Sequence, residues 1–135
     1  QEAHGFALLL DCHSMPSNAS AREERPRADI VLGDRYGTSC PAEITEMVEH
    51  TLRAQGYTVL RNKPYAGGFI TEHYGDPRAG VHALQIEVNR ALYMDEQRYE
   101  KSAGFEALQH DLNGLVEAIA AFTLAGIVAL PDAAE

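Results

Sequence analysis

Two short apolar runs in this chain each lead into side chains that can bind a metal or move a proton. The first run covers residues 6–12 and is followed by His13, and the second, 82–88, contains Glu87 and leads into Arg90. In an open α/β sheet, ligands sit beyond the carboxyl ends of the strands, where apolar runs give way to polar residues. Two strand ends of this kind predict one shared site.

Glu87 is the strongest candidate for acid–base chemistry. It is embedded in the apolar run 84–88, where an ionised carboxylate is costly without a partner. One interpretation pairs it with Arg90 in a structural ion pair. The other makes it a general base whose pKa is set by burial and a nearby cation. The sequence leaves both open.

His13 beside such a carboxylate suggests metal-assisted hydrolysis. A zinc ion polarises a carbonyl and lowers the pKa of bound water, while the carboxylate takes the proton. A lone histidine after a strand is more often a packing residue, and a catalytic zinc normally needs about three protein ligands. The chain offers His13 as its one convincing ligand, with His73 as a weaker second imidazole.

Several other positions could bind a substrate. Arg90 carries a planar fork of donors that suits a carboxylate, and Asn89 could orient that fork or bind substrate directly. Both could equally satisfy loop backbone. Gly67 and Gly68 allow the backbone to approach a ligand closely, and Tyr65 adds aromatic surface beside them. Their spacing does not match the glycine motifs of nucleotide sites.

The elements that must position these residues alternate between strand and helix. We expect strands at 6–12, 29–33, 57–61 and 82–88, helices at 41–55 and 105–122, a last helical turn at 1–4, and a loop at 13–28. Segment 62–75 should begin as a loop and end as a short strand or a helical turn. The imperfect alternation in 82–88 predicts a strand that is buried on both faces. This alternation predicts an α/β fold with a mixed, largely parallel sheet and flanking helices.

Composition narrows the function classes. With 135 residues, 45% of them hydrophobic, the chain can form one globular domain, and its net charge of -9 with scattered Lys and Arg argues against binding nucleic acid. Cys12 and Cys40 form no CxxC pair, so we expect reduced thiols in a cytoplasmic protein. No run approaches the roughly 20 apolar residues of a membrane span, so we expect no membrane partner.

Four segments taken together are specific for one family. Residues 8–16, 29–38, 62–71 and 85–96, with Tyr74–Gly75 between the last two, closely resemble the N-formylglutamate amidohydrolases and occur in the family's order. Any one segment would be weak evidence, but together they are specific, and the resemblance spans roughly residues 5–125.

The resemblance implies a zinc-dependent hydrolase with a zinc-carboxypeptidase-like fold of the phosphorylase/hydrolase-like type. It would cut N-formyl-L-glutamate into formate and L-glutamate during histidine degradation. In this comparison His13 looks like a zinc ligand, Glu87 like the carboxylate that activates water, and Arg90 like a clamp for a substrate carboxylate. A small, doubly acidic substrate would also suit the backbone amides near Gly67 and Gly68.

The resemblance also implies that residues 1–135 form a single α/β domain that is the carboxy-terminal half of a longer catalytic domain. The other zinc ligands would lie in the amino-terminal half, so we expect this chain by itself to be inactive. Two alternatives stay open. One is a related zinc amidohydrolase or carboxypeptidase-like enzyme acting on another N-acyl amino acid, and the other is a non-catalytic homologue. The sequence carries no signal for an oligomeric state.

Overall fold

The computed structural model describes residues 1–17 and 28–129, with side chains up to residue 122 in the last helix. Its elements are β1 (Ala7–Met15), β2 (Ile30–Gly33), α1 (Ala42–Ala54), β3 (Val59–Arg61), α2 (Phe69–Tyr74), β4 (Val81–Asn89), β5 (Met94–Asp95), β6 (Glu100–Lys101) and α3 (Phe105–Ala129). Short 3₁₀ turns at Pro77–Ala79 and Arg90–Leu92 precede and follow β4.

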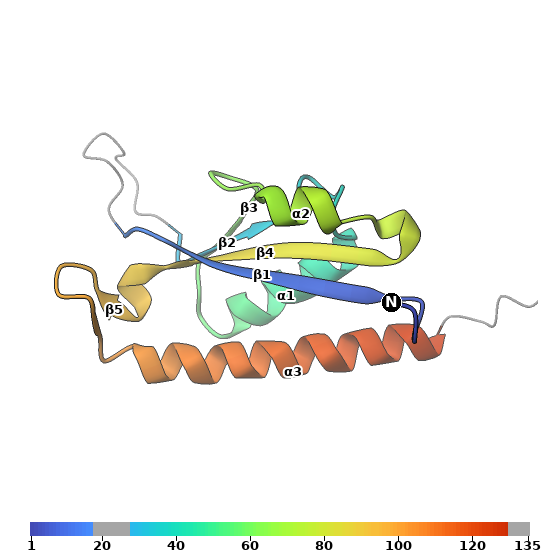
Figure 1. Ribbon diagram of the computed structural model, residues 1–135. Coiled ribbons are helices and arrows are strands. Elements are labelled where there is room, and N and C mark those ends of the chain that lie inside the picture. The colour runs from blue at the N-terminus through green and yellow to red at the C-terminus, as the bar shows by residue number, and fades with distance from the viewer. Residues whose placement is uncertain (18–27, 130–135) are drawn as a thin grey trace, which may run out of the picture.

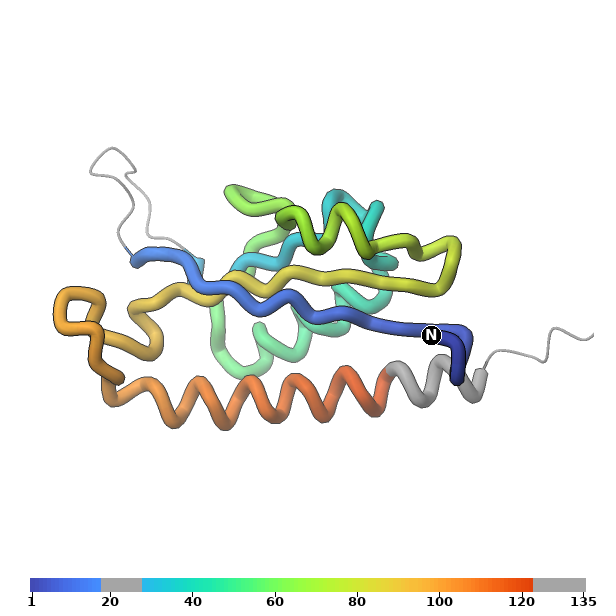
Figure 2. Tube along the Cα trace, in the orientation of Figure 1, coloured from blue at the N-terminus to red at the C-terminus, as the bar shows by residue number. Residues whose placement is uncertain are grey.

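The main sheet has the strand order β1-β4-β2-β3. β1 runs parallel to β4 and β2 runs parallel to β3, whereas β2 and β4 are antiparallel. Figure 2 shows β1 and β4 side by side along most of their length. The expected mixed, largely parallel sheet is therefore confirmed.

The two faces of the sheet have different environments. Leu84, Ile86 and Val88 of β4 pack in the main core with residues of α1 and α3, and Figure 1 shows both helices on one side of the sheet. The alternate residues point to the other face, which is covered by α2 and the loops beside it. All residues of β4 from His82 onward are buried, which agrees with the prediction of a strand enclosed on both faces.

The helices follow the predicted periodicity with three corrections, at Pro41, Val116 and Phe122. In α1, Ile44, Val48 and Leu52 are buried at helical spacing. Pro41, which the sequence predicted as the first helical residue, is the extended N-cap instead, because its ψ of 147° lies outside the helical region. In α3, the apolar residues of the sequence at helical spacing are Phe105, Leu108, Leu112, Leu115, Val116, Ile119 and Phe122, and this spacing predicts one buried stripe. Val116 is exposed instead.

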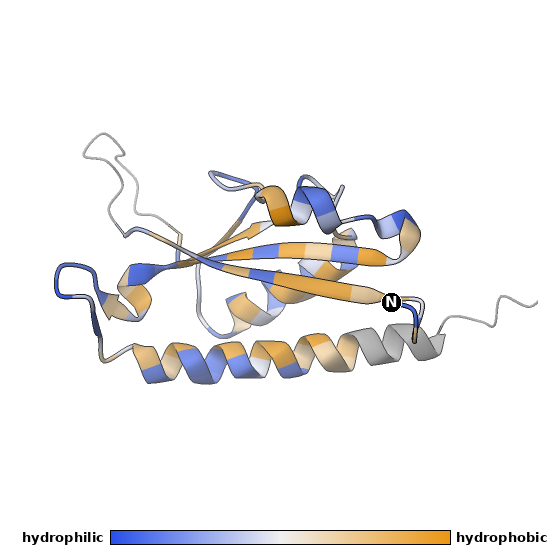
Figure 3. Ribbon diagram, in the orientation of Figure 1, coloured by the Kyte–Doolittle hydropathy of each residue, from blue (hydrophilic) through white to orange (hydrophobic). Residues whose placement is uncertain are grey.

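Figure 3 shows polar and apolar residues alternating along the described part of α3. Leu108, Leu115 and Ile119 form its buried stripe, and Phe122, which was also expected there, is exposed. The buried stripe is therefore narrower than predicted. No helix among the described residues is long and apolar enough to span a membrane.

The boundaries near the predicted site also differ from the expectation. β1 continues to Met15, so His13 lies within the strand and not after it. Segment 1–4 forms a hydrogen-bonded turn in which the Gly5 amide donates to the Gln1 carbonyl oxygen at 2.6 Å. Segment 62–75 could have ended as a short strand or a helical turn, and its residues 69–74 form the short helix α2. Most of the predicted 13–28 loop, residues 18–27, lies outside the described residues.

The buried His82 should make the stability of the fold sensitive to acid. Its ring is buried against Phe6, with ring centroids 4.8 Å apart, and its Nδ1 has no hydrogen-bond partner in the described part of the chain. Burial lowers the pKa of His82 below its ordinary value of 6.5. Between the folded and unfolded pKa values the unfolded chain binds more protons, so the free energy of unfolding should fall as the pH drops below about 6.5.

Urea unfolding at about pH 7.5 and about pH 5.5 measures this effect, since the two values bracket an ordinary histidine pKa. His82→Phe should show a smaller loss of stability on acidification than the wild type. Replacement of the exposed His50 on α1 by Gln is the matched control and should leave the loss unchanged. An equal pH dependence in wild type and His82→Phe would contradict the assignment.

Candidate active site

The β1–β4 pairing brings the two principal candidate residues together. His13 and Glu87 are direct partners in the parallel register, and both point to the face opposite α1 and α3. The Nδ1 atom of His13 lies 3.8 Å from Oε1 of Glu87. The Glu87 side chain is 9% exposed, whereas the His13 side chain is 48% exposed. A buried carboxylate and an accessible imidazole therefore share one site, as predicted.

The loop before α2 forms the wall of this site. An open pocket of about 340 Å³ is lined by His13, Pro64, Tyr65, Ala66, Gly67, Gly68, Gln85 and Glu87. Three of the residues predicted to bind substrate, Tyr65, Gly67 and Gly68, therefore lie in the same pocket as the imidazole and the carboxylate.

Gly33 at the end of β2 permits this close approach of loop and sheet. A Cβ atom at this position would lie 2.6 Å from the Gly67 amide nitrogen and 2.7 Å from the carbonyl carbon of Ala66. Both are backbone atoms, which cannot swing aside as a flexible side chain can. Gly67 itself has a φ of +114°, a region that other residues rarely adopt.

Gln85 connects the loop to the carboxylate, and the sequence analysis did not single it out. The Gly68 amide donates to its Oε1 at 2.7 Å, and its Nε2 donates to Oε1 of Glu87 at 2.8 Å. Gln85 is 4% exposed. Its position two residues before Glu87 in the same strand was the available signal, because alternate residues share a face.

Asp11 is a second residue that the sequence analysis missed. Its side chain is 9% exposed, and its Oδ1 lies 3.0 Å from Nε2 of His13. Its other oxygen, Oδ2, is buried with no hydrogen-bond partner among the described residues. The two ring nitrogens of His13 therefore face different carboxylates.

Arg90 and Asn89 lie near this site but do not line its pocket. The Arg90 Nε donates to the Ser14 hydroxyl at 3.1 Å, and its Nη1 lies 3.9 Å from Oε1 of Glu96. Asn89 donates to a backbone oxygen at Ala28 and accepts from a backbone amide at Ala91. The contacts of Asn89 match its structural alternative, whereas Arg90 contacts side chains and not loop backbone. The role of both residues in substrate binding stays a prediction.

The ion pair between Glu87 and Arg90, which the sequence also allowed, is not formed between these two described residues. Glu87 is held by Gln85, and Arg90 faces Ser14 and Glu96. This arrangement leaves the Glu87 carboxylate facing the pocket.

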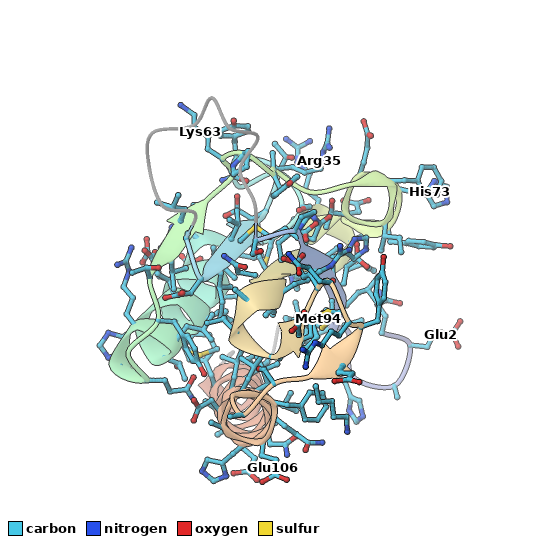
Figure 4. All side chains as sticks on the ribbon, turned by 90° about the vertical axis from the view of Figure 1, so that its left-hand side faces the viewer. Glu2, Arg35, Lys63, His73, Met94 and Glu106 are labelled. Atoms are coloured by element: carbon cyan, nitrogen blue, oxygen red, sulfur yellow. The ribbon has the colours of Figure 1, made fainter. Side chains whose placement is uncertain are left out.

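His73 is placed on the surface of α2. Its ring stacks on Phe69, with centroids 5.0 Å apart and an interplanar angle of 13°, and contacts Tyr74 edge-on. In Figure 4 the labelled His73 points outward from the molecule. The structure therefore does not bring this second imidazole to His13.

A larger pocket of about 490 Å³ lies on the helical side of the sheet, between β1 and α3. Its walls are mainly apolar, with Phe105, Leu108 and Leu112 among them. The Cys12 thiol also lines it, but burial and then the charge of Asp11 raise the pKa of that thiol, which makes it a poor nucleophile. The smaller pocket, which holds Glu87, is the better candidate.

The structure thus has an α/β sheet whose parallel strands place an imidazole beside a buried carboxylate, under a glycine loop. The model of the N-formylglutamate amidohydrolase family matches residues 1–94, and the chain belongs to this family.

Similarity to individual proteins supports the same family assignment. The chain is 40% identical to N-formylglutamate deformylase of Pseudomonas aeruginosa over 94 residues, which cover 69% of this chain and 35% of that protein. It is 37% identical to N-formylglutamate deformylase of Pseudomonas putida over 97 residues, or 71% of this chain and 36% of that protein.

The crystal structure of N-formylglutamate amidohydrolase from Ralstonia eutropha JMP134 superimposes with a TM-score of 0.87 at 43% identity. The match covers 93% of this chain and 46% of that one. The chain thus spans less than half the length of the relatives that it matches.

Gly33→Ala should destabilise the loop wall. The added methyl group would overlap the backbone at Gly67, and overpacking of this kind costs about 1–3 kcal/mol in free energy of unfolding. The control is Gly114→Ala in α3, whose Cβ would meet Gln55 Nε2 at an ordinary 3.5 Å. Urea unfolding should show a loss for the first variant and none for the second. An unaffected Gly33→Ala would mean that the loop packs elsewhere.

Proposed function

We propose that the protein carrying this chain is a zinc-dependent amidohydrolase that converts N-formyl-L-glutamate into formate and L-glutamate. The observation that carries the proposal is the placement of His13 beside the buried Glu87 in a pocket walled by the Gly67–Gly68 loop. The names of the relatives support the choice of substrate.

His13 has the donor chemistry for one zinc ligand. Its Nε2 faces Asp11, which leaves Nδ1 directed toward Glu87 and available to a metal. The described residues contain no cluster of three or more His, Cys, Asp or Glu side chains that could hold a metal ion. We therefore propose that further ligands come from outside the described residues. Bound zinc would polarise the formyl carbonyl and make water easier to deprotonate.

Glu87 is the group of this chain that would move the proton. It would accept a proton from water as the water oxygen bonds to the formyl carbon. When the carbon–nitrogen bond breaks, the same proton would pass to the departing nitrogen of glutamate. Gln85 would keep the carboxylate oriented through its 2.8 Å hydrogen bond. Glu87 would therefore act first as the general base and then as the general acid.

The loop and the nearby arginine would select an acidic substrate. Gly67 and Gly68 bring backbone to the pocket wall, and Tyr65 gives it an apolar surface. Arg90 would clamp a substrate carboxylate by exchanging its long 3.9 Å contact with Glu96 for a closer one. We further propose a cytoplasmic enzyme with no nucleic-acid or membrane partner.

Glu87→Gln tests the catalytic assignment in the full chain as the cell makes it. Loss of a general base should lower kcat for N-formyl-L-glutamate by about 10²-fold or more. The zinc content, measured by atomic absorption, should not change. Unchanged turnover would make Glu87 structural.

The wild-type protein should also be compared on N-formyl, N-acetyl and N-succinyl glutamate. Preference for a larger acyl group would favour the related amidohydrolase acting on another N-acyl amino acid. Absence of turnover on all three would favour a non-catalytic homologue.

Gln85→Leu tests whether the link from loop to carboxylate supports turnover. The variant removes a hydrogen bond to a charged group, which is worth about 1.5–3 kcal/mol, so kcat should fall by about tenfold or more. Steady-state kinetics on the full chain measures this loss. Gln97→Leu, at an exposed position, should leave kcat unchanged. Equal kcat values in the two variants would contradict a role for Gln85.

A further inference from the structure

Asp11 and His13 form a defined pair on β1. They lie two residues apart on one strand and therefore point to the same face of the sheet. Nε2 of His13 lies 3.0 Å from Oδ1 of Asp11. An ionised carboxylate can only accept hydrogen bonds, so the proton of this contact must be on Nε2. In the neutral ring, Nδ1 then carries the free lone pair.

We propose that Asp11 is a positioning residue that holds His13 as the Nε2–H tautomer and so presents Nδ1 beside Glu87 as the metal-binding atom. The part of this inference that concerns metal rests on the proposed function. Metal-binding histidines commonly donate their other ring N–H to a carboxylate or carbonyl, which fixes both tautomer and ring orientation.

The surroundings of Asp11 favour this role over a purely structural one. A buried carboxylate is costly, and a structural carboxylate would be expected to have both oxygens satisfied. Here Oδ1 is used by His13, while the buried Oδ2 has no partner in the described part of the chain. The hydrogen bond to the His13 imidazole therefore explains why a carboxylate is present at position 11.

The geometry also separates the two nitrogens of His13. The Nδ1 side faces Glu87 at 3.8 Å across the β1–β4 register, and the Nε2 side faces Asp11. The half-exposed ring has space to turn unless something holds it. Asp11 supplies the restraint, because a flipped ring would give up the 3.0 Å contact.

The tautomer can be measured in the metal-free full chain by long-range ¹H–¹⁵N correlation NMR, with the His13 signals assigned from a His13→Gln spectrum. For the neutral form of the ring we expect the pattern of protonation at Nε2. In Asp11→Leu the pattern should move toward a mixture of tautomers, whereas Asp11→Asn, whose amide oxygen can still accept, should keep it. A wild-type ring protonated at Nδ1 would overturn the proposal without any variant.

Zinc titration supplies the second readout. With Zn²⁺ alone as the probe, Asp11→Leu should raise the Kd by about 10–100-fold, the usual cost of losing such a partner. Asp11→Asn should stay close to wild type, as should Glu46→Gln, which removes an exposed carboxylate on α1. Equal loss in Asp11→Asn and Asp11→Leu would mean that Asp11 itself binds the metal, and would overturn the positioning role.

The two readouts distinguish failure of this inference from failure of the proposed function. A protein that binds no zinc but keeps the Nε2–H tautomer would refute the zinc enzyme and support the Asp11–His13 pair. If the protein binds zinc but Asp11→Leu changes neither the His13 tautomer nor the Kd for zinc, the positioning role of Asp11 would be refuted. The proposed zinc enzyme would not be affected by that result.

Discussion

The parallel pairing of β1 with β4 is the constraint on which the rest of the structure depends. It makes His13 the partner of Glu87 and Asp11 the partner of Gln85, so four polar side chains meet on one face. A slip of one residue in either strand would turn that strand's polar set toward α1 and α3 and its apolar set toward the opposite face. The same pairing therefore builds the core and the site.

The two faces also explain why these polar residues can be buried. On the helical face the strands contribute apolar side chains to one core. On the other face, the buried polar side chains have partners within the protein: the Gly68 amide donates to Gln85, Gln85 donates to Glu87, and Oδ1 of Asp11 meets His13. The loop over this face is thus part of the site, and Gly33 allows it to lie against the sheet.

The sequence predicted the alternation of strands and helices because apolar periodicity is a local property. It also predicted the grouping of His13, Glu87, Tyr65 and the two glycines, since strand ends and a glycine loop are locally visible. Gln85 was missed because its second partner, the Gly68 amide, lies in another segment, and Asp11 was missed because alternation along a strand does not show which side chains on one face are in contact. The side-chain partners of Arg90 and the exposure of Val116 depend on tertiary packing, which periodicity does not specify.

The central claim is that His13 and Glu87 act in one metal-dependent site, with His13 binding through Nδ1. The most direct measurement is a crystal structure of the full, zinc-loaded chain, with the metal located by anomalous scattering at the zinc edge. We predict a zinc ion coordinated by Nδ1 of His13 and facing Glu87. Zinc bound through Nε2, or held at a place away from His13, would contradict the account.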